Sequence, residues 1–160
     1  MCVKGLIPAI LVSLFFLATC NSRPPRIGSA APDFTIPDGR RSISLSQFRG
    51  KPVVLNFWAT WCPPCIQEMP SLVQLQRQLG DKVTILAVSE DDDVNSYEQF
   101  VRDHNIDLLT VRDTKHSNDL YGTFKFPETF VIDSNGKIVR KFIGAADWTS
   151  PEIVDYLKKL

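Results

Sequence analysis

Val-Val-Leu-Asn-Phe-Trp-Ala-Thr-Trp-Cys-Pro-Pro-Cys, residues 53–65, is the stretch that decides the fold of this chain. Its first part is a mostly apolar run that predicts a buried β-strand, and the Cys-x-x-Cys that follows predicts the start of a helix. One helical turn brings the sulfurs of Cys62 and Cys65 within bonding distance. Free backbone N–H groups and the helix dipole favour a thiolate at Cys62. We therefore predict a redox dithiol, with Cys62 as the nucleophile and Cys65 as the resolving thiol.

The overall composition fits one globular domain with a short extension. The chain has 160 residues, 44% of them hydrophobic, and a formal net charge of zero. Nothing in this balance favours nucleic acid or an acidic surface as a partner. The one charge block, residues 90–93, precedes a helical pattern, and we interpret it as acids favoured at a helix start. A metal site there is the alternative, but no second acidic cluster accompanies it.

The N-terminus has the pattern of an export signal. Lys4 provides a positive charge, and Leu6–Ala18 is an uncharged apolar run. This run is shorter than the roughly 20 residues of a membrane-spanning helix. It ends in Leu-Ala-Thr-Cys, which is similar to the bacterial lipobox, so we expect lipidation of Cys20. A nonlipidated signal and an uncleaved anchor are alternatives, and all three place the domain outside the cytoplasm.

These patterns divide the chain into a signal peptide with lipobox at 1–20, a Pro-rich tether at 21–30 and a domain at 31–160. Removal of the signal would leave Cys62 and Cys65 as the only cysteines of the domain. A disulfide that closes so short a loop adds little stability. Structural zinc would need two more ligands, which His104 and His116 are not placed to supply. We therefore expect no metal and interpret the dithiol as catalytic.

Strand and helix patterns alternate in the first half of the domain, which predicts an α/β fold with a mixed central sheet. Pro70 is expected to kink the helix that follows Cys62. The expected strands and hairpins are an opening hairpin at 34–45, buried strands at 53–58 and 83–88, a short strand at 108–111 and a closing hairpin at 129–143. The expected helices follow Cys62 and lie near 95–104, 117–121 and 151–160.

Several segments together resemble the thioredoxin superfamily, and more narrowly its exported TlpA/ResA-like branch of thiol-disulfide oxidoreductases. The resemblance covers about residues 28–160 and implies a thioredoxin-like fold, a mixed central sheet flanked by helices. The segments that carry it are 31–34, 50–65, Glu68 with Pro70, and 127–133.

The resemblance implies a substrate groove beside the dithiol. Pro127 is expected to be cis, to face the dithiol and to leave a backbone edge free for an extended substrate. Phe126 and Glu128 depart from the common pattern and are expected to face the same groove. Trp61 and Pro63 complete the expected substrate-binding residues. Trp58 and Trp61 are expected to flank the site as apolar walls that are both structural and substrate-facing.

Proton transfer needs a group near Cys65. Many cytoplasmic thioredoxins have a buried Asp where this chain has Asn56, which cannot titrate. Glu68 lies one helical turn after Cys65, and the resemblance implies that it is the acid beneath the dithiol. We hypothesise that Glu68 exchanges protons with Cys65; the alternative is a solvated acid in the first helical turn. The pair Asp147-Trp148 is interpreted as packing.

The expected function is reduction of disulfides in exported proteins, with apocytochrome c as a plausible client. Electrons would come from a membrane thiol reductase, because the chain has no nucleotide or flavin motif and no cofactor is expected. A monomer is expected, without nucleic acid. The alternatives are a disulfide-donating oxidase, a thiol peroxidase, and a Sco-like copper-binding assembly protein, which would use a wider Cys-x-x-x-Cys and a downstream His.

Overall fold

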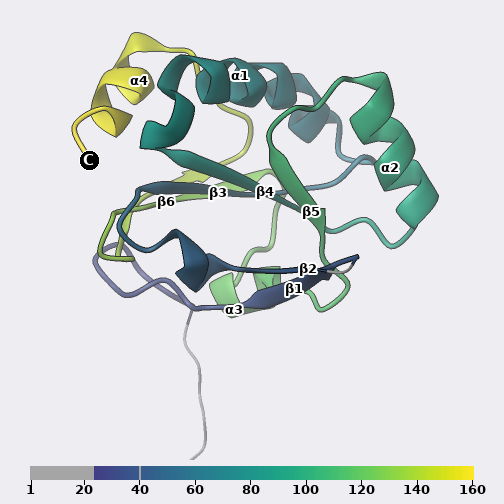
Figure 1. Cartoon of the computed structure of the whole chain (residues 1–160), viewed down its shortest axis with the longest axis horizontal. Helices are drawn as coiled ribbons and strands as arrows, with labels where there is room; N and C mark the ends of the chain where they lie inside the picture. Colours follow the sequence, from purple (N-terminus) through teal and green to yellow (C-terminus); the bar gives the residue numbers. More distant parts are fainter. Residues whose placement is uncertain (1–23, 40) are drawn as a thin grey trace, which may run out of the picture.

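A five-stranded sheet in the order β5-β4-β3-β6-β7 forms the centre of the computed structural model, which describes residues 24–39 and 41–160 (Figure 1). Its strands are β3 (Val53–Trp58), β4 (Thr84–Ser89), β5 (Leu109–Arg112), β6 (Glu128–Ile132) and β7 (Ile138–Ile143). Strands β3, β4 and β5 are parallel, whereas β6 is antiparallel to both β3 and β7. Every residue of β3 is buried, because both faces of the sheet are covered.

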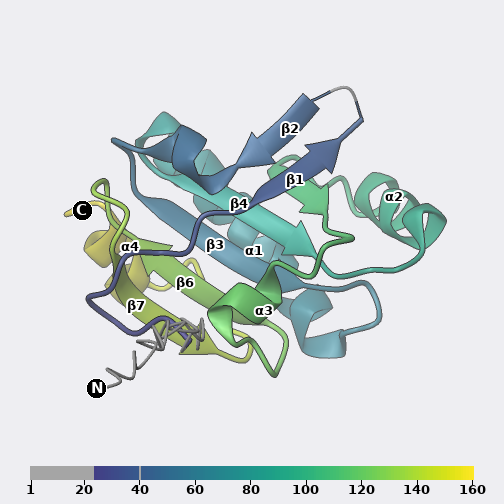
Figure 2. The same ribbon diagram turned by 90° about the horizontal axis from the view of Figure 1, so that it is seen from below.

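Two layers cover the sheet, as Figures 1 and 2 show. One face carries the longer helices, which are α1 (Pro63–Leu79), α2 (Val94–Asp103) and α4 (Pro151–Leu157). The other face carries the hairpin β1 (Thr35–Asp38) and β2 (Arg41–Ser44), the turn η1 (Leu45–Phe48) and the short helix α3 (Asn118–Tyr121). A second 3-10 turn, η2 (Gly80–Lys82), follows α1. Strand alternation divides β3 between two apolar clusters, with Trp58 on the α1 side and Phe57 on the hairpin side.

The expected α/β fold with a mixed sheet and an opening hairpin is confirmed, and the predicted elements lie within a few residues of the observed ones. Helix α1 continues past Pro70 to Leu79. The tether expected at 21–30 ends earlier than expected. Gly28 donates a backbone hydrogen bond to Ile138 (2.7 Å), and Ala30 bridges to Lys137, so this part of the chain lies against β7. The signal peptide, Cys20 and the first tether residues lie outside the described residues.

Among the residues that the structure describes, no helix is both long and apolar enough to cross a membrane.

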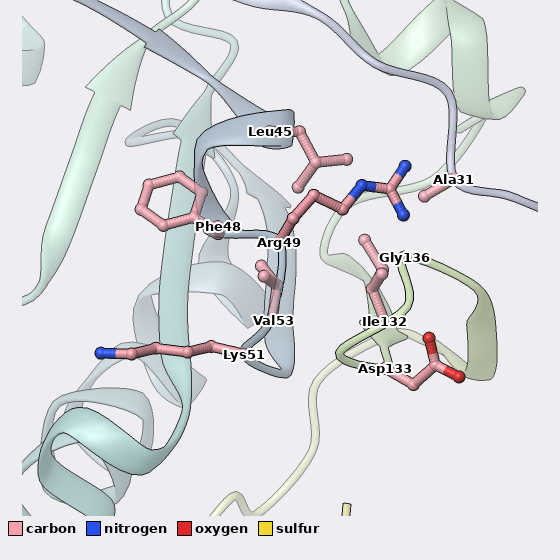
Figure 3. A pocket seen from close by; sticks show the side chains of 9 residues that line it. All are labelled: Ala31, Leu45, Phe48, Arg49, Lys51, Val53, Ile132, Asp133 and Gly136. Atoms are coloured by element: carbon pink, nitrogen blue, oxygen red, sulfur yellow. The ribbon is translucent and has the colours of Figure 1, made fainter.

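A small cavity lies beside Val53, the first residue of β3, and so at the opposite end of this strand from Cys62 (Figure 3). It holds about 10 Å³, close to the volume that one water molecule needs. The Arg49 guanidinium lies against the turn at Gly136 and donates to the Asn135 carbonyl. A β-carbon at Gly136 would collide with that guanidinium, and the φ of +77° also favours glycine there. This cavity is too small for a substrate.

Candidate active site

The two cysteines form a disulfide at the start of α1. Their sulfurs are 2.10 Å apart and their Cα atoms 5.3 Å apart. Cys62 is the N-cap of α1, and its Sγ accepts a hydrogen bond from the Cys65 backbone N–H (3.3 Å). The prolines at the first two helical positions lack N–H groups that would otherwise be unpaired. Cys62 is 5% exposed and Cys65 is fully buried, so only Cys62 can meet a client.

A buried aspartate fixes the segment that leads to Cys62. Both carboxylate oxygens of Asp91 accept from the Thr60 backbone N–H (3.1 and 3.0 Å), and Oδ1 also accepts from the Thr60 hydroxyl (2.6 Å). The Ser89 hydroxyl donates to Oδ2 at 2.7 Å. Because Thr60 lies two residues before Cys62, these bonds hold the turn between β3 and α1 in place.

Glu68 lies one turn further along α1 and is only 3% exposed. Its Oε1 accepts from Asn56 Nδ2 (2.8 Å), and its Oε2 accepts from the Ala146 backbone N–H (3.0 Å) and from Trp148 Nε1 (3.1 Å). Burial raises the pKa of Glu68, and the three hydrogen bonds oppose this change without cancelling it. The alternative of a solvated acid in the first turn is therefore wrong.

The loop before β6 lies beside the start of α1. The peptide bond between Phe126 and Pro127 is cis, as expected. The Phe126 ring packs edge-on against the Trp61 ring, with 5.8 Å between the ring centroids. Trp61 is 63% exposed and directly precedes Cys62. An exposed aromatic side chain therefore directly precedes the more accessible sulfur, and the loop that carries the cis proline packs against that side chain.

Comparisons with known proteins agree with this geometry. The profile of the AhpC/TSA family matches residues 27–141. The chain belongs to the AhpC/TSA family. It is 34% identical over 137 residues to the thiol-disulfide oxidoreductase ResA of Bacillus thuringiensis subsp. konkukian, a match that covers 84% of this chain and 78% of the relative. It is also 37% identical over 122 residues to the thioredoxin-like protein YneN of Bacillus subtilis, which covers 73% of this chain and 71% of that protein.

Solved structures place this AhpC/TSA-family chain among thioredoxin-like proteins. The thioredoxin domain of a thiol-disulfide oxidoreductase from Bacteroides vulgatus superposes with a TM-score of 0.73 at 27% identity, covering 84% of this chain and 96% of that one. The pneumococcal exposed lipoprotein thioredoxin from Streptococcus pneumoniae has a TM-score of 0.69 at 25% identity, covering 81% and 100%. This AhpC/TSA-family member is a thiol-disulfide oxidoreductase with a thioredoxin-like fold.

Two expectations about the substrate groove of this oxidoreductase are wrong. Trp58 is fully buried and packs against Phe100 (5.4 Å between ring centroids), so its expected structural role holds, whereas its expected contact with a substrate is wrong. Glu128 is also fully buried, and its Oε1 pairs with Lys141 Nζ at 2.8 Å. Strand alternation explains the second result, because Thr129 points to the α1 side and Glu128 to the opposite face.

The other predicted substrate residues differ in exposure. Trp61 and Pro63 are exposed and Phe126 is half-buried, whereas Pro127 is buried. Phe124 and Ile143 are also exposed apolar side chains. Phe124 is in the loop that carries Pro127, and Ile143 pairs with Glu128 across β6 and β7. In the sequence, only the apolar character of Phe124 and Ile143 pointed to this surface.

Two residues with direct contacts to the site were missed. Asp91 was expected among acids at a helix start, a role that Asp93 fills as the N-cap of α2. Trp148 does pack, with its ring 5.0 Å from that of Phe142 between centroids, but its indole N–H also binds Glu68. A buried tryptophan normally needs an acceptor for its N–H, and this was the available signal.

Glu90 forms a second buried acidic site at the end of β4. Its Oε2 lies 3.3 Å from His116 Nδ1, and the Asn118 amide donates to the same oxygen at 3.0 Å in its hydrogen-bonding orientation. Burial, followed by the nearby Asp113, raises the pKa of Glu90 to about 7. His116 therefore has an acidic neighbour that the sequence did not indicate. Within residues 24–39 and 41–160, no group of three or more His, Cys, Asp or Glu side chains is placed to hold a metal.

This pKa predicts how stability depends on pH. The ordinary value for Glu90 is 4.5, so the folded state holds the proton more tightly than the unfolded state. The contribution of Glu90 to the free energy of unfolding is fully present below about pH 4.5 and is lost as the pH rises through about 7. The loss amounts to at most roughly 3 kcal/mol. Chemical denaturation across this range should show that loss, and Glu90→Gln should abolish it. The exposed control Glu98→Gln should keep the loss; parallel curves for the chain and Glu90→Gln would contradict the prediction.

Proposed function

We propose that this oxidoreductase reduces disulfide bonds of exported proteins from a position held at a membrane by a lipid on Cys20. The observation that carries the proposal is the Cys62–Cys65 disulfide at the N-terminus of α1, with one nearly buried and one fully buried sulfur. The exposed Trp61 beside it suits a polypeptide client. The buried Glu68 suits proton exchange with Cys65.

The chemistry balances within the dithiol and the client. The Cys62 thiolate attacks one client sulfur, forms a mixed disulfide and releases the other client sulfur as a thiolate. Cys65 then gives its proton to Glu68 and attacks Cys62 Sγ, which releases the second client thiolate and closes the Cys62–Cys65 bond. Two electrons pass from the dithiol to the client. A membrane thiol reductase would return them, since the reduced state must be restored after each cycle.

The proposed location at a membrane, outside the cytoplasm, is supported by the N-terminal sequence pattern and by one similar protein. Lys4, the apolar run 6–18 and Cys20 have the order of a lipoprotein signal. One similar structure is named as an exposed lipoprotein thioredoxin. The similarity to ResA favours apocytochrome c among exported clients. We propose that the protein acts as a monomer.

The reduction potential of the Cys62–Cys65 pair tests the proposed direction. Equilibration of the purified full-length chain with defined thiol buffers should give a value near that of thioredoxin, about −270 mV. A value near about −120 mV, typical of the strongest disulfide donors, would instead make the protein an oxidase. Reduction of a disulfide-bearing apocytochrome c by the reduced chain should then be measured, with an unrelated disulfide protein as the comparison.

Glu68→Gln tests the proton transfer. The amide cannot take the Cys65 proton, so we expect resolution of the mixed disulfide to slow by about 100-fold, the usual size of a general-base contribution. The rate of client release from a preformed mixed disulfide is the measurement, by rapid quench across pH 5–9. The exposed control Glu98→Gln should resolve at the parent rate. Equal rates for Glu68→Gln and the parent would remove Glu68 from the mechanism.

A further inference from the structure

Asn56 has one side-chain atom that the mechanism leaves unexplained. The residue is fully buried on β3, and its Nδ2 donates both to Glu68 Oε1 (2.8 Å) and to Thr129 Oγ1 (2.9 Å). Its Oδ1 is buried as well and has no hydrogen-bond partner among the described residues. An unpaired buried carbonyl destabilises a folded protein, so its presence points to a functional role.

The two oxygens of Glu68 are not equivalent. Oε2 accepts from the Ala146 backbone N–H and from the Trp148 indole N–H, and both of these groups can only donate. A proton on Oε2 would therefore face two donors. Oε1 contacts only the Asn56 amide, so a proton that arrives at Glu68 is best held at Oε1. In the present orientation, however, the Asn56 NH₂ group would then point at an O–H donor.

We propose that Asn56 is a positioning residue that turns its amide by half a turn when Glu68 becomes protonated. After the turn, Oδ1 accepts from the protonated Glu68 Oε1. The Thr129 hydroxyl, which now accepts from Asn56, donates to the same Oδ1, because a hydroxyl can do either. The amide then presents a suitable atom to Glu68 in each protonation state. Its other polar group, Oδ1 before the turn and NH₂ after it, lies unpaired in the same buried place, so both states carry that cost. The inference rests on the proposed function only in that the proton is taken to come from Cys65 Sγ.

The groups that surround the Glu68 carboxyl and respond to its protonation are uncharged. Cys65 precedes Glu68 by one turn of α1. Strand β3 contributes Asn56, which Thr129 of β6 contacts from the other side, and the loop between β7 and α4 contributes Ala146 and Trp148. The charged side chain of that loop, Asp147, is exposed and accepts from Thr149 instead. No charged side chain among the described residues adds to the change in the pKa of Glu68. Hydrogen bonds and burial therefore set the balance between its two forms.

Nuclear magnetic resonance of the oxidised full-length chain tests the turn directly, because the closed disulfide leaves Glu68 without a titrating partner cysteine. The ¹³Cδ signal of Glu68, identified by its loss in Glu68→Gln, reports the carboxyl titration. We expect the NOEs between the Asn56 NH₂ protons and Thr129 to weaken at the same pH midpoint. In Glu68→Gln they should be weak at every pH. Constant NOEs, or a Glu68 carboxyl that does not titrate between about pH 3 and 10, would overturn the proposal.

The pKa of Glu68 in variants provides a second, independent test. The Trp148 indole can only favour the carboxylate, so Trp148→Phe should raise this pKa by about one, a tenfold change in proton affinity. Asn56→Ala should change it by less than about 0.3, because the amide serves both forms. Asp147→Asn is the charge control and should leave the titration unchanged. Equal increases in Trp148→Phe and Asn56→Ala would refute the turn, and neither result depends on whether the protein reduces a client.

Discussion

Cys65→Ser is expected to lower the rate of turnover by at least about a thousandfold while leaving the first attack intact. Cys62 keeps its place at the N-terminus of α1 and can still open a client disulfide. The serine hydroxyl cannot displace the client from Cys62 Sγ, because it is a far weaker nucleophile than a thiolate. The protein should therefore stop at the mixed disulfide and hold its client covalently.

Mass spectrometry of the quenched reaction measures this outcome. The Cys65→Ser chain should carry one equivalent of client, and a thiol reductant should release it. Cys62→Ser is the matched control and should show neither turnover nor adduct, because Cys65 is fully buried. Full adduct formation by Cys62→Ser would mean that the assigned order of the two cysteines is wrong.

Asp91→Ala is expected to destabilise the fold and to slow the reaction at Cys62. The substitution leaves the Thr60 N–H and hydroxyl and the Ser89 hydroxyl without their shared acceptor. Loss of such a buried hydrogen-bonding centre costs about 3 kcal/mol. For a domain of this size, we expect the midpoint of thermal unfolding to fall by roughly 10 °C. The freed turn should also place Cys62 less accurately for attack.

Thermal unfolding and the rate of the first attack, measured well below the unfolding midpoint, separate these two effects. The control is Asp92→Ala, which removes the same charge from an exposed neighbour with no side-chain hydrogen bond among the described residues. It should shift the midpoint by no more than a degree or two, as surface substitutions usually do. A similar small shift for Asp91→Ala would show that the Thr60 bonds contribute little.

Local sequence signals were sufficient for the fold and for the reactive pair. The apolar run of β3 and the Cys-x-x-Cys after it determine a strand, a turn and a helix start within 13 residues, 53–65. Glu68 was also within reach, because a spacing of three residues on a helix places it on the face of Cys65. The family resemblance added the cis peptide bond at Pro127, which no local pattern would reveal.

The sequence did not reveal contacts between distant segments. Asp91 lies 31 residues after Thr60, and Trp148 lies 80 residues after Glu68, so each pair meets only through the packing of the sheet. The error at Glu128 has a different origin. The resemblance marked the position as part of the groove, whereas the alternation of β6 turns its side chain into the interior beside Lys141.

The full burial of Cys65 has a consequence for oxidative damage. Peroxides oxidise accessible thiolates first, so in the reduced protein a sulfenic acid should form at Cys62 and not at Cys65. Cys65 lies close enough to condense with that sulfenic acid at once, releasing water and restoring the disulfide. The irreversible sulfinic and sulfonic acids would then rarely form. A chance oxidation would cost the protein only one round of re-reduction.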